Sequence, residues 1–213
     1  MKHILCFGDS NTFGYQALTH GRYEYFERWT GCLQSLLGPS FRIIEEGCNH
    51  RTTVYEDAVF PGRAGNQCLP VCLDSHKPID LVILCLGTND LRTLFHVTSY
   101  DSAAGLYRLI RIIQHHEYEE GFRAPKILIV SPVEVEEVVL QYPHYGFTED
   151  SIAKSRDLKY RYQEVASLFS CDFLDASEVA SASQEDGLHL DVQNHWKLAA
   201  ALAAKVQIIL SAP

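Results

Sequence analysis

The feature that most constrains the fold is an alternation of short apolar segments with stretches of helical periodicity. The apolar, β-rich segments lie at residues 2–7, 41–45, 80–86, 126–131 and 172–175. Helical patterns lie between and after them, at residues 29–37, 66–75, 102–116, 151–169 and 191–210. Most of the apolar segments are continuous rather than alternating, which is typical of parallel strands that are covered on both faces. The order predicts an α/β fold, a three-layer α/β/α sandwich around a five-stranded parallel sheet, in a single domain over residues 1–213.

The charge and the cysteine content limit which classes of partner the protein can bind and which cellular compartment it suits. The formal net charge is −9 at pH 7, and the 18 Lys and Arg residues form no basic stripe, which argues against nucleic acid and anionic membranes as partners. The longest apolar runs, such as residues 81–86, are too short to span a bilayer, so we expect no membrane insertion. The seven cysteines include no CxxC pair, and Cys6 and Cys85 lie inside apolar segments, where a thiol acts as a small hydrophobe. We therefore predict a reducing, cytoplasmic location.

Polar residues capable of chemistry follow the predicted strands, at the points where the strands end. The segments concerned are Gly8-Asp9-Ser10-Asn11, Glu46-Gly47-Cys48-Asn49, Gly87-Thr88-Asn89-Asp90 and, just before the last helix, Asp186-Gly187-Leu188-His189. In open parallel sheets, ligands bind beyond the carboxyl ends of the strands. A parallel sheet brings these ends to one edge, so we expect the four segments to meet there.

Ser10 is the candidate nucleophile of this edge. A free serine is a weak nucleophile, and it needs a general base within hydrogen-bond reach and an acid that orients the base. His189 and Asp186 can supply both roles, because Gly187 allows a tight turn that folds the carboxylate back onto the imidazole. Read alone, Ser10 can equally be a helix cap, and Asp186-Gly187 a common turn pair.

A serine that attacks a carbonyl also needs donors for the oxyanion that develops on it. The candidates are the N–H of Ser10, the N–H of Gly47 and the side-chain amide of Asn89, which lie at three predicted strand ends. A glycine suits a backbone that must approach a substrate closely. Asp90 has two interpretations, either orienting Asn89 or capping the helix that follows.

Four sequence blocks resemble the SGNH, or GDSL-type, hydrolase family. They are "FGDSNTFG", the segment around Gly47, "LGTND" and "DGLHLD", in that order, and they span residues 7–191. The resemblance implies a flavodoxin-like α/β/α sandwich. It also implies that Ser10 is the nucleophile, that Asp186 and His189 complete a triad, and that Gly47 and Asn89 complete the oxyanion hole.

A closer resemblance is to the bacterial arylesterase/acyltransferase branch, through "CFGDSNTFGY", "RWTGCLQSLLG", "IIEEGCNHRTT", "DLVILCLGTNDL" and "KILIVSP". It implies hydrolysis of small acyl esters, acyl transfer to alcohols or peroxide, and assembly into homo-oligomers. The chain departs from the branch at Asn11, Phe13, Asn49 and His50, which we expect to line the substrate pocket. These changes bear on acyl-chain preference.

Other functions stay open at this stage. Within the enzyme interpretation, the alternatives are a carbohydrate O-deacetylase and a thioesterase or lysophospholipase. Outside it stand a flavodoxin-like nucleotide-binding module, although the chain has no Gly-rich phosphate motif, and a pseudo-enzyme that uses the fold for assembly. The histidines and acidic residues show no metal-ligand spacing, so we predict no metal, and a serine mechanism needs no cofactor. The aromatic loop at residues 142–147 is expected to wall a pocket or a subunit contact, and His195 is expected to be a helix residue whose hydrogen bonds are satisfied.

Overall fold

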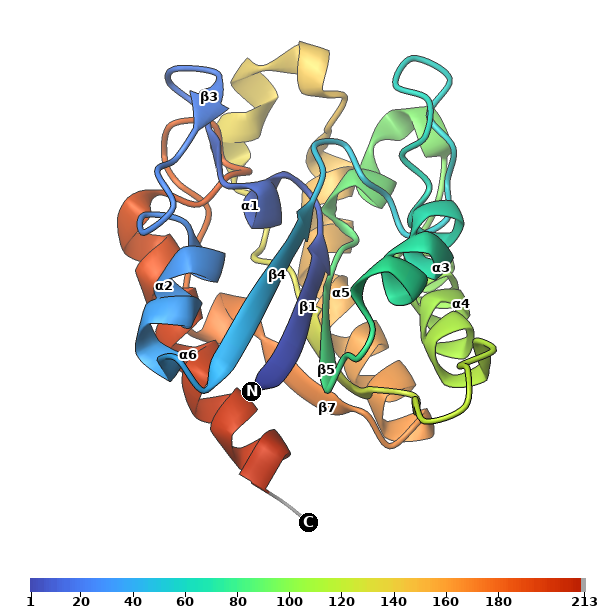
Figure 1. Cartoon of the computed structure of the whole chain (residues 1–213). Coiled ribbons are helices and arrows are strands. Elements are labelled where there is room, and N and C mark those ends of the chain that lie inside the picture. The colour runs from blue at the N-terminus through green and yellow to red at the C-terminus, as the bar shows by residue number, and fades with distance from the viewer. Residues whose placement is uncertain (212–213) are drawn as a thin grey trace.

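The structure, a computed structural model, describes residues 1–211 and is built around a five-stranded sheet (Figure 1). The strand order is β4-β1-β5-β6-β7, and every neighbouring pair is parallel. The strands are β1 Lys2–Gly8, β4 Phe41–Gly47, β5 Leu81–Cys85, β6 Lys126–Ser131 and β7 Asp172–Asp175. The predicted parallel sheet is confirmed, and each strand lies within two residues of its predicted bounds.

Helices cover both faces of the sheet and complete the three predicted layers (Figure 1). One face carries α2 Trp29–Leu37 and α6 Val192–Ser211. The other carries α3 Gly65–His76, α4 Ser99–His115 and α5 Glu149–Leu168. No helix within residues 1–211 is long and apolar enough to cross a membrane.

Strand β1 shows why the apolar segments are continuous. Leu5 and Phe7 point into the core beneath α3, α4 and α5, whereas Ile4 and Cys6 point into the core beneath α2 and α6. All four side chains are fully buried. Because successive residues of a strand face opposite sides, a strand between two helical layers must be apolar at every position.

Helix α4 begins at Ser99, three residues before the start expected from the hydrophobic periodicity. The Thr98 hydroxyl accepts a hydrogen bond from the Asp101 N–H at 3.2 Å, and the Asp101 carboxylate accepts one from the Thr98 N–H at 2.8 Å. This reciprocal pair is a capping box, which satisfies N–H groups that a helix start leaves free. The cap therefore extends the helix beyond its apolar pattern.

The edge of the sheet at which the four polar segments are expected to meet lies at the carboxyl end of β1, which is flanked by β4 and β5. The register pairs Gly8, the last residue of β1, with Gly47 of β4 and with Cys85 of β5, so the three strands end level with one another. The chain passes from β1 to β4 on one side and reaches β5 on the other, which makes β1 the point where the strand order reverses. Ligands bind at such switch points in open α/β sheets.

Short elements surround this edge. They are the single-turn helix α1 Ser10–Phe13, the antiparallel hairpin of β2 Tyr15–Gln16 and β3 Gly21–Arg22, and the 3₁₀ helices η1 Thr88–Leu91, η2 Thr93–Phe95, η3 Glu137–Gln141, η4 Pro143–Tyr145 and, after β7, η5 Ala176–Glu178.

Candidate active site

Ser10 is the first residue of α1, immediately after β1. The Asp9 carboxylate caps this helix by accepting the Asn11 N–H at 3.0 Å, and the Asp9 carbonyl accepts the Phe13 N–H at 2.9 Å. Gly14 ends the helix in the left-handed conformation, with a φ of 82°. A residue at the start of a helix has no intrahelical acceptor for its N–H, so the sharp turn presents both the Ser10 hydroxyl and its N–H.

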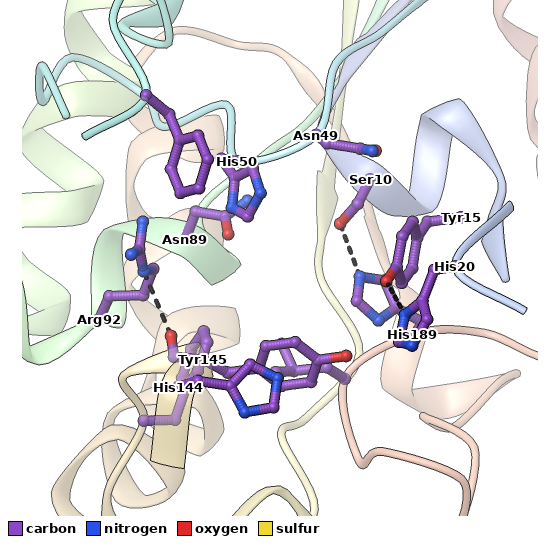
Figure 2. A pocket seen from close by; sticks show the side chains of 13 residues that line it. Ser10, Tyr15, His20, Asn49, His50, Asn89, Arg92, His144, Tyr145 and His189 are labelled. Carbon is purple, nitrogen blue, oxygen red and sulfur yellow. Dashed lines mark hydrogen bonds between the residues drawn. The ribbon is translucent and has the colours of Figure 1, made fainter. Parts of the chain in front are cut away.

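The three candidate triad residues lie within hydrogen-bond distance of one another. Ser10 Oγ is 2.9 Å from His189 Nε2 (Figure 2). His189 Nδ1 is 2.5 Å from Asp186 Oδ2. A carboxylate only accepts hydrogen bonds, so His189 Nδ1 carries the proton and Nε2 accepts from the Ser10 hydroxyl. The structure therefore brings together residues that are 179 positions apart in the chain.

The turn at residues 186–189 folds the carboxylate back as the sequence predicts. Asp186 Oδ1 accepts the N–H groups of Leu188 at 3.0 Å and of His189 at 2.9 Å. Gly187 has a φ of 72°, and an added Cβ would lie 2.8 Å from the Glu136 carbonyl oxygen, so a side chain here would meet both strain and a clash.

Asp186 is buried, and its environment favours the charged form. Burial by itself raises the pKa of this carboxyl, but the hydrogen bond and the charge of His189, together with the two backbone N–H groups, outweigh burial and hold the pKa below its usual range. Asp186 is therefore a carboxylate at neutral pH. It can stabilise an imidazolium at His189.

Asn89 lies in η1, directly after β5, and faces the cavity next to Ser10 (Figure 2). Its Nδ2 donates one hydrogen bond to the Arg51 carbonyl at 3.1 Å. An amide nitrogen carries two hydrogens, so the second remains for a ligand in the cavity. The Arg51 carbonyl thus fixes the amide plane.

Asp90 points away from the cavity and holds η1 in place. Its carboxylate accepts the Thr53 N–H at 2.8 Å and the hydroxyls of Thr53 and Ser102, both at 2.6 Å. Burial raises the pKa of Asp90 to about 6, against the lowering effect of these donors. Of the two interpretations left open by the sequence, the structure favours the one that positions Asn89, because Asp90 ties its turn to the loop at residues 51–53.

Gly47 does not line the cavity. A Cβ at this position would overlap the backbone of Thr12 and Phe13, so the close approach that requires glycine is to helix α1. The cavity wall beside Ser10 is formed instead by Asn49 and His50, two residues along the same segment. His50 has a φ of 65°, and its N–H has no hydrogen-bond acceptor among residues 1–211.

The site opens into a cavity of about 420 Å³. It is lined by Ser10, Tyr15, His20, Asn49, His50, Phe60, Asn89, Arg92, His144, Tyr145, Phe147, Leu188 and His189. Of the four predicted pocket residues, Asn49 and His50 are among them, whereas Asn11 and Phe13 are not. Figure 2 shows Arg92, Asn89 and His50 on one side of this space and Ser10, Tyr15, His20 and His189 on the other.

Asn11 and Phe13 have other contacts, which corrects their assignment to the pocket. Asn11 Nδ2 donates to the Leu188 carbonyl at 3.2 Å, and Asn11 Oδ1 accepts the Leu190 N–H at 2.9 Å. The Arg22 guanidinium lies over the Phe13 ring, with its carbon Cζ 4.4 Å from the ring centroid. The helical turn of α1 directs these side chains away from the face that carries the Ser10 hydroxyl.

Several cavity residues, among them Tyr15, His20 and Phe60, are not predicted from the sequence. The Tyr15 ring lies 4.5 Å from the His189 ring, centroid to centroid, and its hydroxyl is 2.8 Å from His20 Nδ1. His50 and Phe60 stack with ring centroids 4.1 Å apart. The aromatic loop at residues 142–147 walls the cavity, which is one of the two roles predicted for it.

Within residues 1–211, no three His, Cys, Asp or Glu residues gather in a way that would hold a metal ion. The seven cysteines are free thiols.

Comparisons with known proteins agree with this geometry. The profile of the GDSL-like Lipase/Acylhydrolase family matches residues 6–197. The chain superposes on the native M. smegmatis aryl esterase with a TM-score of 0.94 at 37% identity, covering 98% of this chain and 100% of that one. It superposes equally well, with a TM-score of 0.94 at 35% identity, on a carbohydrate acetylesterase family member from Sinorhizobium meliloti, covering 99% of this chain and 100% of that one. A comparison with curated proteins gives no significant match.

The fold and the matched segment define the class of the protein. The chain belongs to the GDSL-like Lipase/Acylhydrolase family, the SGNH hydrolases, and its neighbours are arylesterases and carbohydrate acetylesterases. It is a carboxylic ester hydrolase. The nucleotide-binding module and the pseudo-enzyme, which the sequence left as alternatives, are not supported.

Proposed function

We propose that the protein is a serine esterase that hydrolyses small acyl or aryl esters through an acyl-enzyme on Ser10. The observation that carries this proposal is the hydrogen-bonded series from Ser10 Oγ through His189 to Asp186 at the wall of the cavity. It provides a nucleophile, a base in the required tautomer and a carboxylate that stabilises the charged base.

The mechanism proceeds in two halves. Ser10 Oγ forms a bond to the ester carbonyl carbon while its proton moves to His189 Nε2. The tetrahedral intermediate then collapses, the bond to the alcohol oxygen breaks, and Nε2 returns the proton to that oxygen. A water molecule repeats the sequence on the acyl-enzyme, with His189 as the base, and releases the acid and free Ser10.

Three donors are proposed for the oxyanion. They are the N–H of Ser10, the second hydrogen of Asn89 Nδ2 and the N–H of His50. His50 takes the place that the sequence suggested for Gly47, because the Asn49–His50 turn lines the cavity and Gly47 does not. Preorganised donors of this kind stabilise the transition state because they require no rearrangement when charge develops.

The substrate class follows from the size and the lining of the cavity. A volume of about 420 Å³ with aromatic walls suits a short acyl group and a ring-sized alcohol. It is small for the long acyl chains of a lysophospholipase. An alcohol or peroxide can replace water in the second half-reaction if it enters the same space, which gives acyl transfer or a peracid.

A carbohydrate O-deacetylase is the second candidate. It is favoured by the polar cavity residues His20, His144 and Arg92, which can bind hydroxyl groups, and by the likeness to the S. meliloti carbohydrate acetylesterase. Assembly into a homo-oligomer and a cytoplasmic location remain predictions. Size-exclusion chromatography with light scattering tests the first of these, and cell fractionation tests the second.

The decisive variant is Ser10→Ala. We expect it to abolish hydrolysis of 4-nitrophenyl acetate while circular dichroism and the thermal unfolding curve stay close to those of the parent. Ser167→Ala, the same substitution on the exposed face of α5, is the matched control and should retain activity. Activity that survives in Ser10→Ala would remove Ser10 from the mechanism.

Substrate choice is measured with acyl esters of 4-nitrophenol of increasing chain length and with acetylated sugars. We expect kcat/KM to be highest for the shortest acyl groups. A maximum at long chains would favour the lipid enzyme, and a strong preference for acetylated sugars would favour the deacetylase.

A further inference from the structure

The cavity lining contains no acidic residue although the protein is acidic. The chain has a formal net charge of −9, yet none of the 13 residues that line the cavity is Asp or Glu. Arg92 and four histidines, including His189, line it instead. Arg92 is the only lining residue that carries a charge at every physiological pH. The lining therefore presents no carboxylate to a ligand, and the one permanently charged side chain that it presents is positive.

Arg92 is held rigidly by two partners. Its Nη1 donates to Asp57 Oδ2 at 2.5 Å, and its Nε donates to the Tyr145 carbonyl at 3.2 Å. Asp57 is fully buried, and its other oxygen accepts the N–H groups of Val59 at 2.8 Å and Phe60 at 3.2 Å. Since the carboxylate cannot move, it fixes the orientation of the guanidinium.

The guanidinium keeps donors that the protein does not use. Arginine has five N–H bonds, and the two contacts occupy one on Nε and one on Nη1. The second N–H of Nη1 and both on Nη2 have no hydrogen-bond acceptor among residues 1–211. This unused edge is the part of the fork that can meet a planar acceptor with two parallel hydrogen bonds.

Arg92 lies near the proposed oxyanion donor Asn89 and on the side of the cavity opposite Ser10 and His189. Its N–H donates to the Asn89 carbonyl at 3.3 Å, so it follows the proposed oxyanion donor by one turn. Ser10 and His189 lie across the cavity from it (Figure 2). Burial and the charge of Arg92 lower the pKa of His50, so this neighbouring imidazole is neutral at pH 7. The fixed positive charge that faces a bound substrate is thus that of Arg92.

We propose that Arg92 is a specificity-determining residue that binds a carboxylate of the substrate. The preferred substrate is a small ester that carries a carboxylate a few bonds from the scissile carbonyl. A planar carboxylate matches the free edge of the fork and adds a charge-assisted contact that a neutral ester lacks. This inference rests on the proposed esterase function, because it assigns the substrate of the same site.

The carboxylate can belong to either half of the ester, and two substrate pairs distinguish the halves. For the alcohol half, 4-acetoxybenzoate is compared with its neutral methyl ester. For the acyl half, the 4-nitrophenyl monoester of adipic acid is compared with 4-nitrophenyl hexanoate. In each pair the quantity measured is the ratio of kcat/KM for the anionic ester to that for the neutral one.

The ratio is compared between protein variants, so the intrinsic reactivity of the substrates cancels. Arg92→Gln is combined with Asp57→Asn, since the single change would leave a buried carboxylate unpaired. Arg92→Lys keeps the charge but loses the fork. The double variant leaves the net charge unchanged, and Arg123→Gln, which removes an arginine near the opposite end of the strands, before β6, controls for the loss of a positive charge outside the cavity.

We expect the ratio in at least one pair to fall about tenfold or more in Arg92→Gln/Asp57→Asn, to fall less in Arg92→Lys and to stay constant in Arg123→Gln. In the parent enzyme it should also decrease as salt screens the contact. An unchanged ratio for both pairs in the double variant overturns the inference. Should the double variant not fold, inhibition of the parent enzyme decides: 4-hydroxybenzoate must inhibit more strongly than 4-hydroxybenzamide, or adipate more strongly than its diamide. Equal or weaker inhibition by the anion in both comparisons overturns the inference.

The outcomes also separate the two proposals. If the parent hydrolyses neutral esters in a Ser10-dependent manner without the expected change of ratio, only the role of Arg92 fails. If the parent hydrolyses none of the four esters, the proposed esterase function fails first.

Discussion

At the scale of single residues, three buried carboxyls near one sheet edge have different environments. Asp186 accepts hydrogen bonds from His189 and stays ionised, its pKa held below the usual range. Burial raises the pKa of Asp9 and of Asp90 to about 6, although backbone or hydroxyl donors oppose it. Asp186 is the carboxylate among them that touches the imidazole, so it is the one suited to stabilise a charge at His189.

The first prediction at this scale concerns Asp186→Asn. The amide keeps an oxygen for the Leu188 and His189 N–H groups but presents an NH₂ to His189 Nδ1. Nδ1 then becomes the acceptor, and Nε2 carries the proton and cannot act as a base toward Ser10. We expect kcat for 4-nitrophenyl acetate to fall by about 10³–10⁴-fold with little change in KM. A loss below tenfold would contradict the tautomer argument.

The second prediction concerns Asn89→Ala, which removes one proposed oxyanion donor. We expect kcat to fall by about 10²-fold or more, because the contact strengthens as charge develops on the carbonyl oxygen. Steady-state kinetics with 4-nitrophenyl acetate measures it. A rise in KM at unchanged kcat would mean that Asn89 binds the ground state instead.

At the scale of elements, Asn11 joins α1 to the segment at residues 186–190. It bonds the backbone of Leu188 and Leu190, on either side of His189, so it fixes the base relative to the nucleophile. The sequence could place Asn11 near Ser10 but could not show where its amide points, because that depends on a segment 177 residues away. The structure therefore makes Asn11 a positioning residue.

Asn11→Ala tests this role. It leaves a buried carbonyl and a buried N–H without partners, and we expect a loss of about 1–3 kcal/mol in the free energy of unfolding. kcat should fall, while the relative rates for acyl chains of different length stay the same. A changed chain-length profile would return Asn11 to the pocket wall.

His195 plays a comparable structural role between α6 and α2. Its Nδ1 accepts the Trp29 N–H at 3.2 Å, at the first turn of α2, and its Nε2 is buried without a partner among residues 1–211. Burial lowers the pKa of His195 to about 3. The sequence predicts a residue whose hydrogen bonds are satisfied, but the protein satisfies only one of the two ring nitrogens.

The pH dependence of stability follows from that pKa. Below pH 6.5 the unfolded chain binds a proton at His195 and the folded chain does not, so the neutral histidine stabilises the fold at pH 7 and loses this contribution as the pH falls. Between pH 7 and pH 5 the parent should lose about 2 kcal/mol more of unfolding free energy than His195→Gln. Urea unfolding of both proteins measures it. The contributions of Asp9 and Asp90 have the opposite sign but are common to both, and equal pH profiles would contradict the assignment.

For the whole molecule, the sequence predicts the sheet and the position of the triad better than the walls of the cavity. The strands and the meeting of Ser10, Asp186 and His189 at one edge follow from apolar periodicity and from the geometry of parallel sheets. The walls follow only in part: the aromatic loop at residues 142–147 is predicted as a wall, but His20, Phe60 and Arg92 are not, because they lie in turns whose paths depend on tertiary packing. Gly47 illustrates the limit: glycine signals a close approach, but the sequence cannot say whether a substrate or helix α1 makes it.

We propose that Ser10 carries the acyl group during turnover, and trapping of the acyl-enzyme decides whether it does. The enzyme is quenched in acid during steady-state hydrolysis of 4-nitrophenyl acetate, digested and analysed by tandem mass spectrometry. We expect one acetyl group on Ser10 in the parent enzyme and no acetyl group at this position in Ser10→Ala. An acetyl group on another side chain, with Ser10 unmodified, would contradict it.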